Sequence, residues 1–275
     1  RGPYRSRTVD SVVKEVRKLI NNGAKEINLI AQDTTYFRIP EEREESLTAL
    51  LRELDHIRAK KWIRLMYAHP VRITHAVARA IEDSRSICHY IDMPIQHISA
   101  DILKSMGRAG TPDTIYRAIQ LLRHHVPDIA LRTTVMVGFP GETDRHFQEL
   151  LQFVRDMRFE KLGIFKYSKE PGTPAASLRR QVSARVKEER HEALMREQML
   201  ISRSLNESLV GQKMEVLIEG TDESNPTEAI GRTYRDAPEV DGVIRISCKE
   251  RPPVHSFQQV VVTAAHDYDL EGKLL

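Results

Sequence analysis

Apolar and polar residues alternate along the first 167 positions in a pattern that repeats five times. Short runs rich in β-branched and apolar residues are typical of buried strands and cover 27–31, 62–67, 87–92, 131–137 and 161–167. Between these runs, apolar residues recur every three or four positions, which predicts helices. Strands that alternate with helices at intervals of roughly 30 to 40 residues are joined in parallel by right-handed crossovers. The pattern therefore predicts an α/β fold with a parallel sheet.

The clearest unit of this repeat covers residues 131–153. After its strand, Gly138, Pro140 and Gly141 break the apolar pattern, and Thr143 is a good N-cap for the helix that follows. Folds of this kind bind ligands at the carboxyl ends of their strands, and glycine lets a ligand approach the backbone. A purely structural turn would contain the same glycines, so the assignment of a site depends on the recurrence of the unit.

Polar residues or glycines follow each of the five predicted strands. If the strands are parallel, these residues face one rim, where the loops of such barrels build active sites. They are Gln32 and Asp33, His69, Gln96 and His97, residues 138–142, and Ser168.

The chain changes character after residue 209. A long helix is predicted over 183–209, and short strands are predicted over 214–220, 242–247 and 258–265. Turns are predicted at Gly211, Gly220, Gly231 and Gly242. This pattern predicts a small antiparallel barrel of the oligonucleotide-binding type, and we place the boundary between two domains, 1–207 and 208–275, before it.

The net charge of +3 hides an asymmetry between the two parts. Residues 210–275 contain seven Lys and Arg against twelve Asp and Glu, a net charge of −5, which leaves +8 for residues 1–209. A basic body suits anionic cofactors or nucleic acid, whereas an acidic tail repels phosphate backbones and favours a basic protein as partner.

The sequence indicates neither a membrane helix nor a signal peptide. It has no run of about 18 apolar residues, and the basic opening RGPYRSR is not followed by an apolar segment, so we expect a cytoplasmic protein. The only cysteines are Cys88, in a predicted buried strand, and Cys248. Two distant cysteines predict neither a disulfide framework nor a zinc or iron–sulfur site, and no metal ligands are assigned.

Several long segments together resemble the radical S-adenosylmethionine methylthiotransferases. They are YIDMPIQHISADILKSMGR, LRTTVMVGFPGETDRHFQELLQFV and GIFKYSKEPGTPA, in that order. The branch of this family that modifies a ribosomal protein is resembled further by EINLIAQDTTYF and by the tail segments GRTYRDAPEVDG and HDYDLEG. The resemblance implies a partial barrel of the (β/α)6 type, here without its first strand, followed by a small β-barrel called a TRAM domain.

The same family holds a four-iron four-sulfur cluster on a C-x3-C-x2-C loop after its first strand, and a second such cluster in an amino-terminal domain. This sequence opens with RGPYRSR, which resembles the segment just after that loop, and neither set of cysteines is present in it. We therefore expect a fragment of a longer protein that cannot perform the radical chemistry by itself.

The resemblance implies an enzyme that uses S-adenosylmethionine to add a methylthio group to the β-carbon of an aspartate on a small-subunit ribosomal protein. A deoxyadenosyl radical would abstract the hydrogen, and a sulfur from the second cluster would then be added and methylated. The acidic TRAM domain would attract the basic ribosomal protein. Nucleic acid and membranes are not expected partners, and the full-length protein is expected to be a monomer.

The resemblance also implies contacts to the cofactor along the rim. The expected cofactor-binding residues are Gln32, Gln96, Arg132, Gly138, Phe139, Gly141, Glu142, Phe165, Tyr167 and Ser168.

Within this set, residues 138–142 are expected beside the methionyl or adenosyl part, and Gln96 near the ribose. Arg132 is expected to pair with the methionine carboxylate, and residues 165–168 to line the adenine. The substrate side would be formed by Asp33 and His69, with Gln32 close to it.

Two other functions fit the sequence. A methylthiotransferase that acts on an adenosine in transfer RNA shares the barrel motifs, but a domain that grips RNA should be basic, and this tail is acidic. A non-catalytic scaffold or binding module would also lack the cysteine loop.

Overall fold

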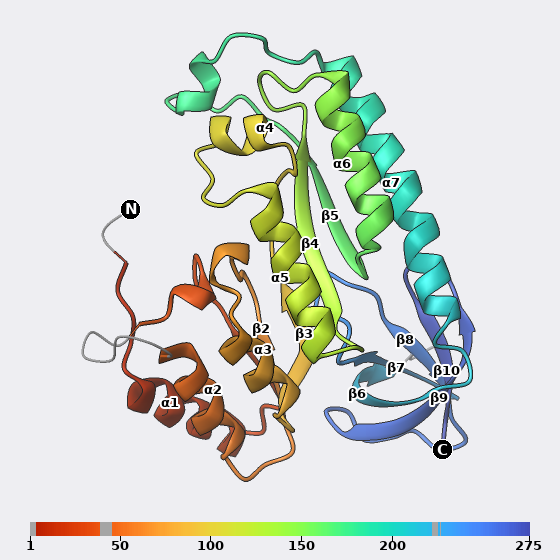
Figure 1. The fold of residues 1–275 in the computed structure, drawn as a ribbon. Helices are drawn as coiled ribbons and strands as arrows, with labels where there is room; N and C mark the ends of the chain where they lie inside the picture. The colour runs from red at the N-terminus through yellow and green to blue at the C-terminus, as the bar shows by residue number, and fades with distance from the viewer. Residues whose placement is uncertain (1–3, 39–45, 222–224, 226) are drawn as a thin grey trace.

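A computed structural model describes residues 4–38, 46–221, 225 and 227–275, so the first three residues of the basic opening lie outside the described part. Five parallel strands form one sheet in the order of the sequence. The strands, labelled in Figure 1, are β1 (Glu26–Leu29), β2 (Trp62–Leu65), β3 (Ile87–Asp92), β4 (Ala130–Val137) and β5 (Lys161–Lys166). The predicted parallel α/β sheet is confirmed.

The first two strands are shorter than predicted, and after β2 the carbonyl groups of Met66 and Tyr67 bond to the turn that follows β1. The Thr34 hydroxyl donates to the Met66 carbonyl at 2.7 Å, and the Thr34 amide donates to the Tyr67 carbonyl at 3.1 Å. Tyr67 has a left-handed backbone with φ of 57°, which ends the extended run.

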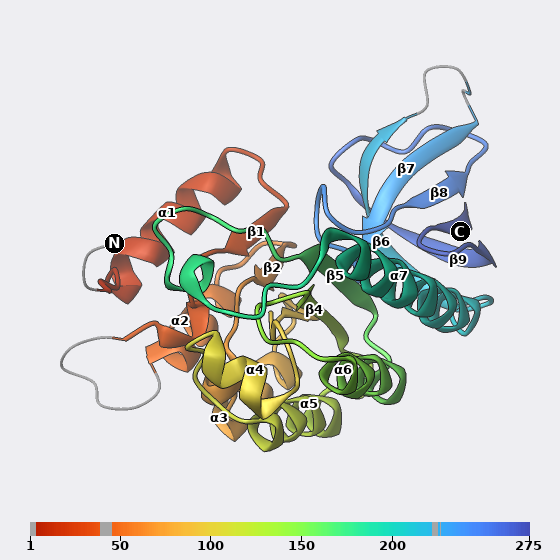
Figure 2. The same cartoon turned by 90° about the horizontal axis from the view of Figure 1, so that it is seen from above.

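Helices cover the outer side of the arc formed by the strands (Figure 2). Each of the predicted helices is present, Thr143 caps its helix as expected, and Thr111 caps another, both in capping boxes. The helices on this side are α1 (Val9–Asn21), α2 (Ser46–Asp55), α3 (His75–Glu82), α4 (Ala100–Ser105), α5 (Pro112–His125) and α6 (Asp144–Met157). Short 3-10 turns lie at η1 (Thr34–Tyr36), η2 (Pro70–Arg72) and η3 (Pro174–Ser177).

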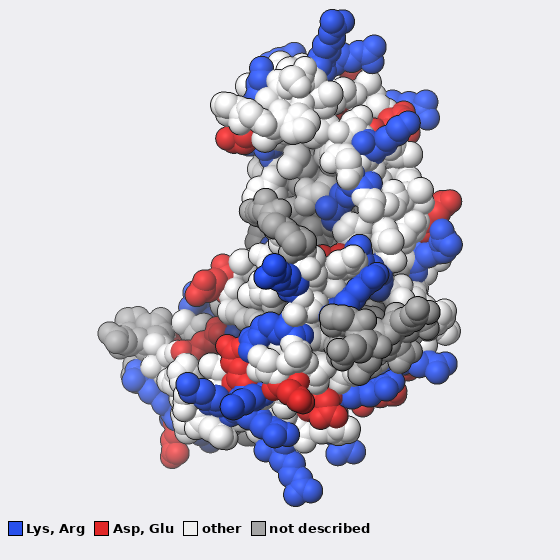
Figure 3. Space-filling model, turned by 90° about the vertical axis from the view of Figure 1, so that its left-hand side faces the viewer, with Lys and Arg blue, Asp and Glu red and all other residues white. Residues whose placement is uncertain are grey.

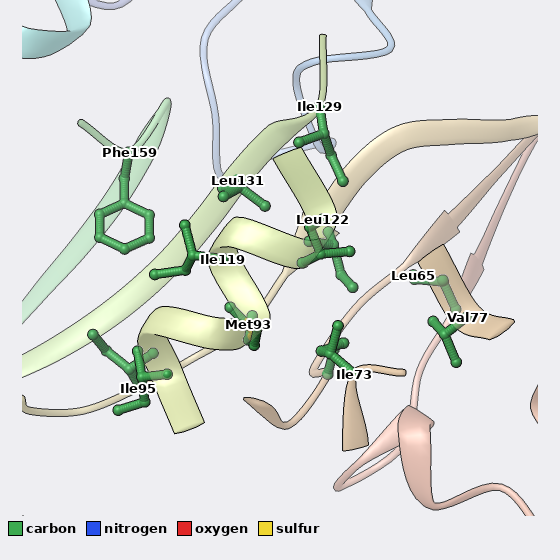
Figure 4. Packing of buried hydrophobic residues seen from close by; sticks show 14 of the residues in the cluster. Leu65, Ile73, Val77, Met93, Ile95, Ile119, Leu122, Ile129, Leu131 and Phe159 are labelled. Atoms are coloured by element: carbon green, nitrogen blue, oxygen red, sulfur yellow. The ribbon is translucent and has the colours of Figure 1, made fainter. Parts of the chain in front are cut away.

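The hydrophobic core lies between these helices and the sheet. Figure 4 shows Ile119 of α5 on the side of Leu131 of β4 and Phe159, and Leu122 on the opposite side of the same helix. Successive residues of a strand face opposite sides, so β4 buries every second side chain here. The intervening residues, among them Arg132, are partly exposed on the other face of the sheet, which is therefore the face available to a ligand.

The long helix α7 (Ala184–Glu207) leads to a closed five-stranded barrel, here called the C-terminal barrel. Its strands are β6 (Lys213–Thr221), β7 (Glu228–Thr233), β8 (Ile244–Ser247), β9 (Phe257–Ala265) and β10 (Leu270–Leu274). The prediction of a small antiparallel barrel or sheet is confirmed for the closed barrel and for four of its five strand pairings, whereas β10 pairs with β8 in parallel. Two strands, β7 and β10, were not predicted.

Two of the four tail glycines predicted at turns lie inside strands instead. Gly220 is in β6 beside a register shift, and Gly231 is in β7. A Cβ at Gly231 would lie 2.6 Å from the Leu217 carbonyl oxygen, so glycine is needed there for close strand pairing.

The C-terminal barrel packs near the amino-terminal ends of the strands, on the face of the sheet that the helices leave free. Trp62, Cys88 and Tyr90 contact Leu217 and Ala237 there in a separate apolar cluster. The carboxyl ends of the strands are left for a site. Within the described residues, no helix is long and apolar enough to cross a membrane.

Candidate functional site on the carboxyl rim

The turns that follow the five strands form one continuous rim, as predicted. Backbone hydrogen bonds of 2.7–3.1 Å join each turn to the next strand or turn. The pairs are Thr34 to Tyr67, Ala68 to Asp92, Gln96 to Thr134 and Tyr167 to Val137. Because each link is between backbone atoms, the shape of the rim does not depend on the rotamers of exposed side chains.

Glu142 fixes the turn after β4. Its buried carboxylate accepts from the Gly138 amide at 2.8 Å and from Nη1 of Arg190 at 2.7 Å. Nε2 of His97 lies 3.6 Å from the same carboxylate and has no hydrogen-bond partner among the described residues. The turn is thereby tied to α7, which supplies Arg190, and to the turn after β3.

The two glycines of this turn have different surroundings. Gly138 has φ of 75°, and a Cβ there would lie 2.3 Å from Cγ of Lys187, so α7 itself requires glycine at this position. Gly141 has φ of 90° and no atom within 4 Å of its Cβ direction. Only Gly141 therefore leaves open space in which a ligand could approach the turn.

This difference predicts unequal effects of two alanine variants. Gly141→Ala should destabilise the protein by about 1–2 kcal/mol, the cost of a left-handed residue with a Cβ. Gly138→Ala should cost about 1–3 kcal/mol more, because its Cβ also overlaps Lys187. Urea denaturation measures both, and Gly138→Ala combined with Lys187→Ala should recover the additional loss. Equal effects of the two single variants would show that the Lys187 contact is unimportant.

Aromatic residues surround the end of β5. The rings of Phe139 and Tyr167 meet edge to face at 5.3 Å, and the buried Tyr167 hydroxyl has no partner within the described structure. The Phe165 side chain lies on the same face of the sheet as those of Thr134 and Arg132, because atoms of all three lie within 4 Å of a Cβ built at Gly163. Phe165 is 57% exposed. It thus presents an uncovered aromatic surface above the sheet.

Three predicted residues lie at the edges of this arrangement. Gln96 has a left-handed backbone, with φ of 70°, and bridges β4 through both its amide and its carbonyl. Ser168 is exposed and donates to Glu170 at 2.7 Å, and Gln32 is exposed at the start of the rim. The roles expected for these residues toward a cofactor stay predictions.

Asp33 and His69 lie close together on the part of the rim after β1 and β2. Asp33 pairs with Arg72 at 2.6 Å and accepts from the Thr35 hydroxyl, which in turn accepts from the His69 amide at 3.2 Å. Burial lowers the pKa of His69, and the nearby Arg108 and Arg72 lower it further. Sequence analysis did not single out these arginines, although both lie within a few residues of a predicted strand end or glycine turn.

Arg132 is the third residue of β4, so its backbone lies farther from the rim than the turn that follows this strand. Its Nη1 donates to Asp92 at 2.8 Å, and its Nε lies 3.5 Å from Asp241 of the C-terminal barrel. Burial alone would lower the pKa of Arg132, but the charge of Asp92 and the other acidic groups raises it overall. Its guanidinium is already balanced by carboxylates, and its expected pairing with a methionine carboxylate stays a prediction.

Within the described residues, no group of three or more His, Cys, Asp or Glu side chains could hold a metal ion. Cys88 and Cys248 are both buried and free. Burial raises the pKa of the Cys88 thiol from its ordinary 9.0 to about 12. Neither cysteine is placed to ligate a metal on the rim.

Because both thiols are buried, we predict that an iron–sulfur cluster cannot be reconstituted on this chain. After anaerobic incubation of this chain with iron and sulfide, we expect no stoichiometric cluster absorbance. We also expect Cys88 to resist iodoacetamide at pH 8, because the side chain is buried and the raised pKa of its thiol leaves very little thiolate at that pH. A stable cluster, or alkylation of Cys88 as fast as in the urea-unfolded chain, would contradict this description.

The sheet with its rim and the C-terminal barrel each match a known family. Residues 1–154 match the model of the radical SAM superfamily, and residues 210–275 match that of the TRAM domain. The chain is similar over its whole length to ribosomal protein uS12 methylthiotransferases RimO, being 42% identical to that of Carboxydothermus hydrogenoformans and 44% to that of Geobacter sulfurreducens. It spans 63% and 61% of the lengths of these two relatives.

A solved structure supports the fold independently. The coproporphyrinogen III oxidase HemN of Escherichia coli, described as a radical SAM enzyme, superimposes with a TM-score of 0.52 at 16% identity, over 72% of this chain and 45% of that one. Since the superfamily model covers more than half of the residues, including the first four strands and the turn after β4, this chain belongs to the radical SAM superfamily.

Proposed function

We propose that this chain is part of an enzyme that methylthiolates ribosomal protein uS12, at the β-carbon of an aspartate. The observation that carries this proposal is the identity of 41–44% to RimO enzymes, which extends through both the sheet and the C-terminal barrel. We also propose that residues 1–207 and 208–275 are its two domains, divided between α7 and β6. A cytoplasmic location is part of the same proposal.

S-adenosylmethionine fits the rim as the superfamily would require. The exposed ring of Phe165 offers a stacking surface for a base, and the unpartnered hydroxyl of Tyr167 and Nε2 of His97 are buried polar atoms beside the same turn. Gly141 leaves open space next to them. When bound and reductively cleaved, the cofactor would supply the radical that abstracts hydrogen from the substrate.

The residues of this chain would bind and shield that cofactor. Phe165 and Tyr167 would hold the adenine, and the Gly141 turn and Gln96 would bound the ribose and methionyl parts. Glu142, held by Arg190, would keep the turn in place. Apolar side chains at the same end, including Phe139, would exclude water from the reacting atoms.

The iron–sulfur clusters that the superfamily and RimO imply do not fit the residues described, because no suitable ligand group is present among them. We derive no step through the clusters from this chain. Two four-iron four-sulfur clusters, bound by other residues, remain part of the proposal through the resemblance to the methylthiotransferases.

We propose the basic protein uS12 as the partner, the C-terminal barrel as its acidic contact and a monomeric enzyme. Several acidic residues of the barrel pair with the rest of the chain, so fewer remain for a partner than the charge count suggests. These pairs are Glu215 with Lys60, Asp236 with Lys161, Asp241 with Arg132 and Asp267 with Arg203. Binding of uS12 through the remaining acidic groups should weaken as salt is raised.

Deletion of the gene that encodes this chain tests the function. Mass spectrometry of ribosomal proteins should show that uS12 loses the mass of one methylthio group in place of hydrogen, and that the intact gene restores it. The nucleosides of transfer RNA from the same strains should be unchanged. Unmodified uS12 in the parent strain, or loss of methylthioadenosine instead, would reject the proposal.

A further inference from the structure

Positive side chains gather on the rim beside β1, β2 and β3. Arg38, Arg72 and Arg108 lie there, and among the described residues only the carboxylate of Asp33 forms an ion pair with any of them, to Arg72 at 2.6 Å. Figure 3 views this side of the molecule and shows Lys and Arg side chains on it, with acidic side chains among them. Counted over the described residues alone, these three guanidinium groups exceed the carboxylates paired with them.

The aromatic ring of Tyr36 orders two of these guanidinium groups. Arg72 lies over it at 4.4 Å and Arg38 at 4.5 Å, measured to the ring centre. Arg72 is thus held by both a ring and a carboxylate, and its position does not need a ligand. Arg38 is exposed and has no ion-pair partner among the described residues.

Arg108 is partly buried in the loop between α4 and α5 and forms no ion pair with any described residue. Its Nη2 donates to the Pro94 carbonyl, and its other guanidinium donors have no acceptor among the described residues. Burial lowers the pKa of Arg108, and Asp33 opposes this only in part. A half-buried guanidinium without a carboxylate is costly unless an anion binds to it.

His69 supplies a second donor beside the loop of Arg108, because that loop packs against the segment after His69: a Cβ at Gly110 would lie 2.9 Å from Cγ2 of Val71. Its Nδ1 accepts from the Val71 amide at 3.3 Å, so the proton of the neutral ring is on Nε2. Burial, Arg108 and Arg72 all lower the pKa of His69, which favours this neutral form. The neutral ring therefore keeps one N–H, at Nε2, as a donor for a ligand.

We propose that Arg108, assisted by Arg72 and the Nε2–H of His69, forms a carboxylate-binding subsite at the mouth of the sheet. This inference rests on the proposed function, in which two carboxylates reach the rim: that of the substrate aspartate and that of the methionine part of the cofactor. Arg108 and His69 would bind the carboxylate, the group that these two ligands have in common, through charge-assisted hydrogen bonds. They are positioning residues, because no reacting atom is assigned to them.

Calorimetry on this chain distinguishes the two sources. The probes are S-adenosylmethionine, a uS12 peptide that contains the aspartate, and the same peptide with asparagine. The variants are Arg108→Gln, Arg108→Lys and, as matched control, Arg117→Gln in the exposed part of α5, where the side chain only donates to the backbone of its own helix. Thermal melting establishes that each variant is folded.

If the ligand is the substrate, the native chain should bind the aspartate peptide about tenfold or more tightly than the asparagine peptide. Arg108→Gln should abolish this preference, Arg108→Lys should retain part of it, and Arg117→Gln all of it. If the ligand is the cofactor, Arg108→Gln should instead weaken S-adenosylmethionine binding by a similar factor. Unchanged binding of both ligands to Arg108→Gln would overturn the subsite.

The same variant in cells separates this inference from the proposed function. If deletion of the gene leaves uS12 unchanged, the function itself is wrong. If deletion removes the methylthio group and the gene carrying Arg108→Gln restores it as fast as the intact gene, the function stands and only the subsite is rejected.

Discussion

Replacing Glu26 with glutamine is expected to lower the free energy of unfolding by about 3–5 kcal/mol. Glu26 of β1 pairs with Nε of Arg64 at 2.7 Å and with Nη2 of Arg232 at 2.6 Å. The side chains of Arg64 and Arg232 are only 0% and 4% exposed. Removal of the Glu26 charge would leave the buried guanidinium of Arg64 without its carboxylate partner and that of Arg232 with Glu219 alone, at 2.6 Å. Because Arg232 belongs to β7, the variant should also loosen the C-terminal barrel from the sheet.

The exposed ion pair between the same two parts provides the control. Lys60 pairs with Glu215 of β6, but the Lys60 side chain is 61% exposed. Glu215→Gln should therefore cost less than about 1 kcal/mol. Urea denaturation followed by circular dichroism measures both variants. Equal, small losses would mean that the buried pairs do not join the barrel to the sheet.

Arg190→Met is expected to lower the free energy of unfolding by a similar amount, about 3–5 kcal/mol, because it also removes one partner of a buried ion pair, here in the candidate site. Its loss leaves the carboxylate of Glu142 buried, with the Gly138 amide as its remaining close donor. The turn after β4 should then become mobile, and binding of S-adenosylmethionine should weaken. Chemical denaturation and calorimetry give the two quantities on the same preparation.

Two further variants separate this effect from the loss of any arginine on α7. Arg185→Met removes an exposed pair with Glu189 on the same helix and should leave stability and binding nearly unchanged. The double variant Glu142→Gln with Arg190→Met should lose less than the sum of the single variants, because the two groups interact directly. Additive losses would show that the pair is not the unit that holds the turn.

Local sequence patterns were sufficient to predict the parallel sheet and the common rim at the carboxyl ends of its strands. Each parallel strand is a short apolar run between helical patterns, and the cap residues Thr111 and Thr143 act within a few residues of their own position. Parallel strands also force their carboxyl ends to the same edge, so a correct assignment of strands was enough to bring Asp33, His69 and Gly138 to one rim.

Contacts between distant parts of the chain could not be predicted in this way. β7 has a glycine in its centre because β6 approaches it closely, and a local rule therefore assigned that glycine to a turn. Likewise, the excess of acidic residues in the tail is explained in part by partners in the sheet domain, such as Arg132 and Lys161. Arg190 lies 48 residues from Glu142, and no periodicity links the two.

The turns after the five strands form one mouth, which we propose as the binding site of S-adenosylmethionine. Hydrogen–deuterium exchange of this chain with and without saturating S-adenosylhomocysteine tests this proposal. Amides at 94–99, 138–143 and 165–168 should become protected together, while the amino-terminal ends of the same strands and the C-terminal barrel should not change. Protection confined to the barrel or to the outer helices, with the rim unaffected, would contradict it.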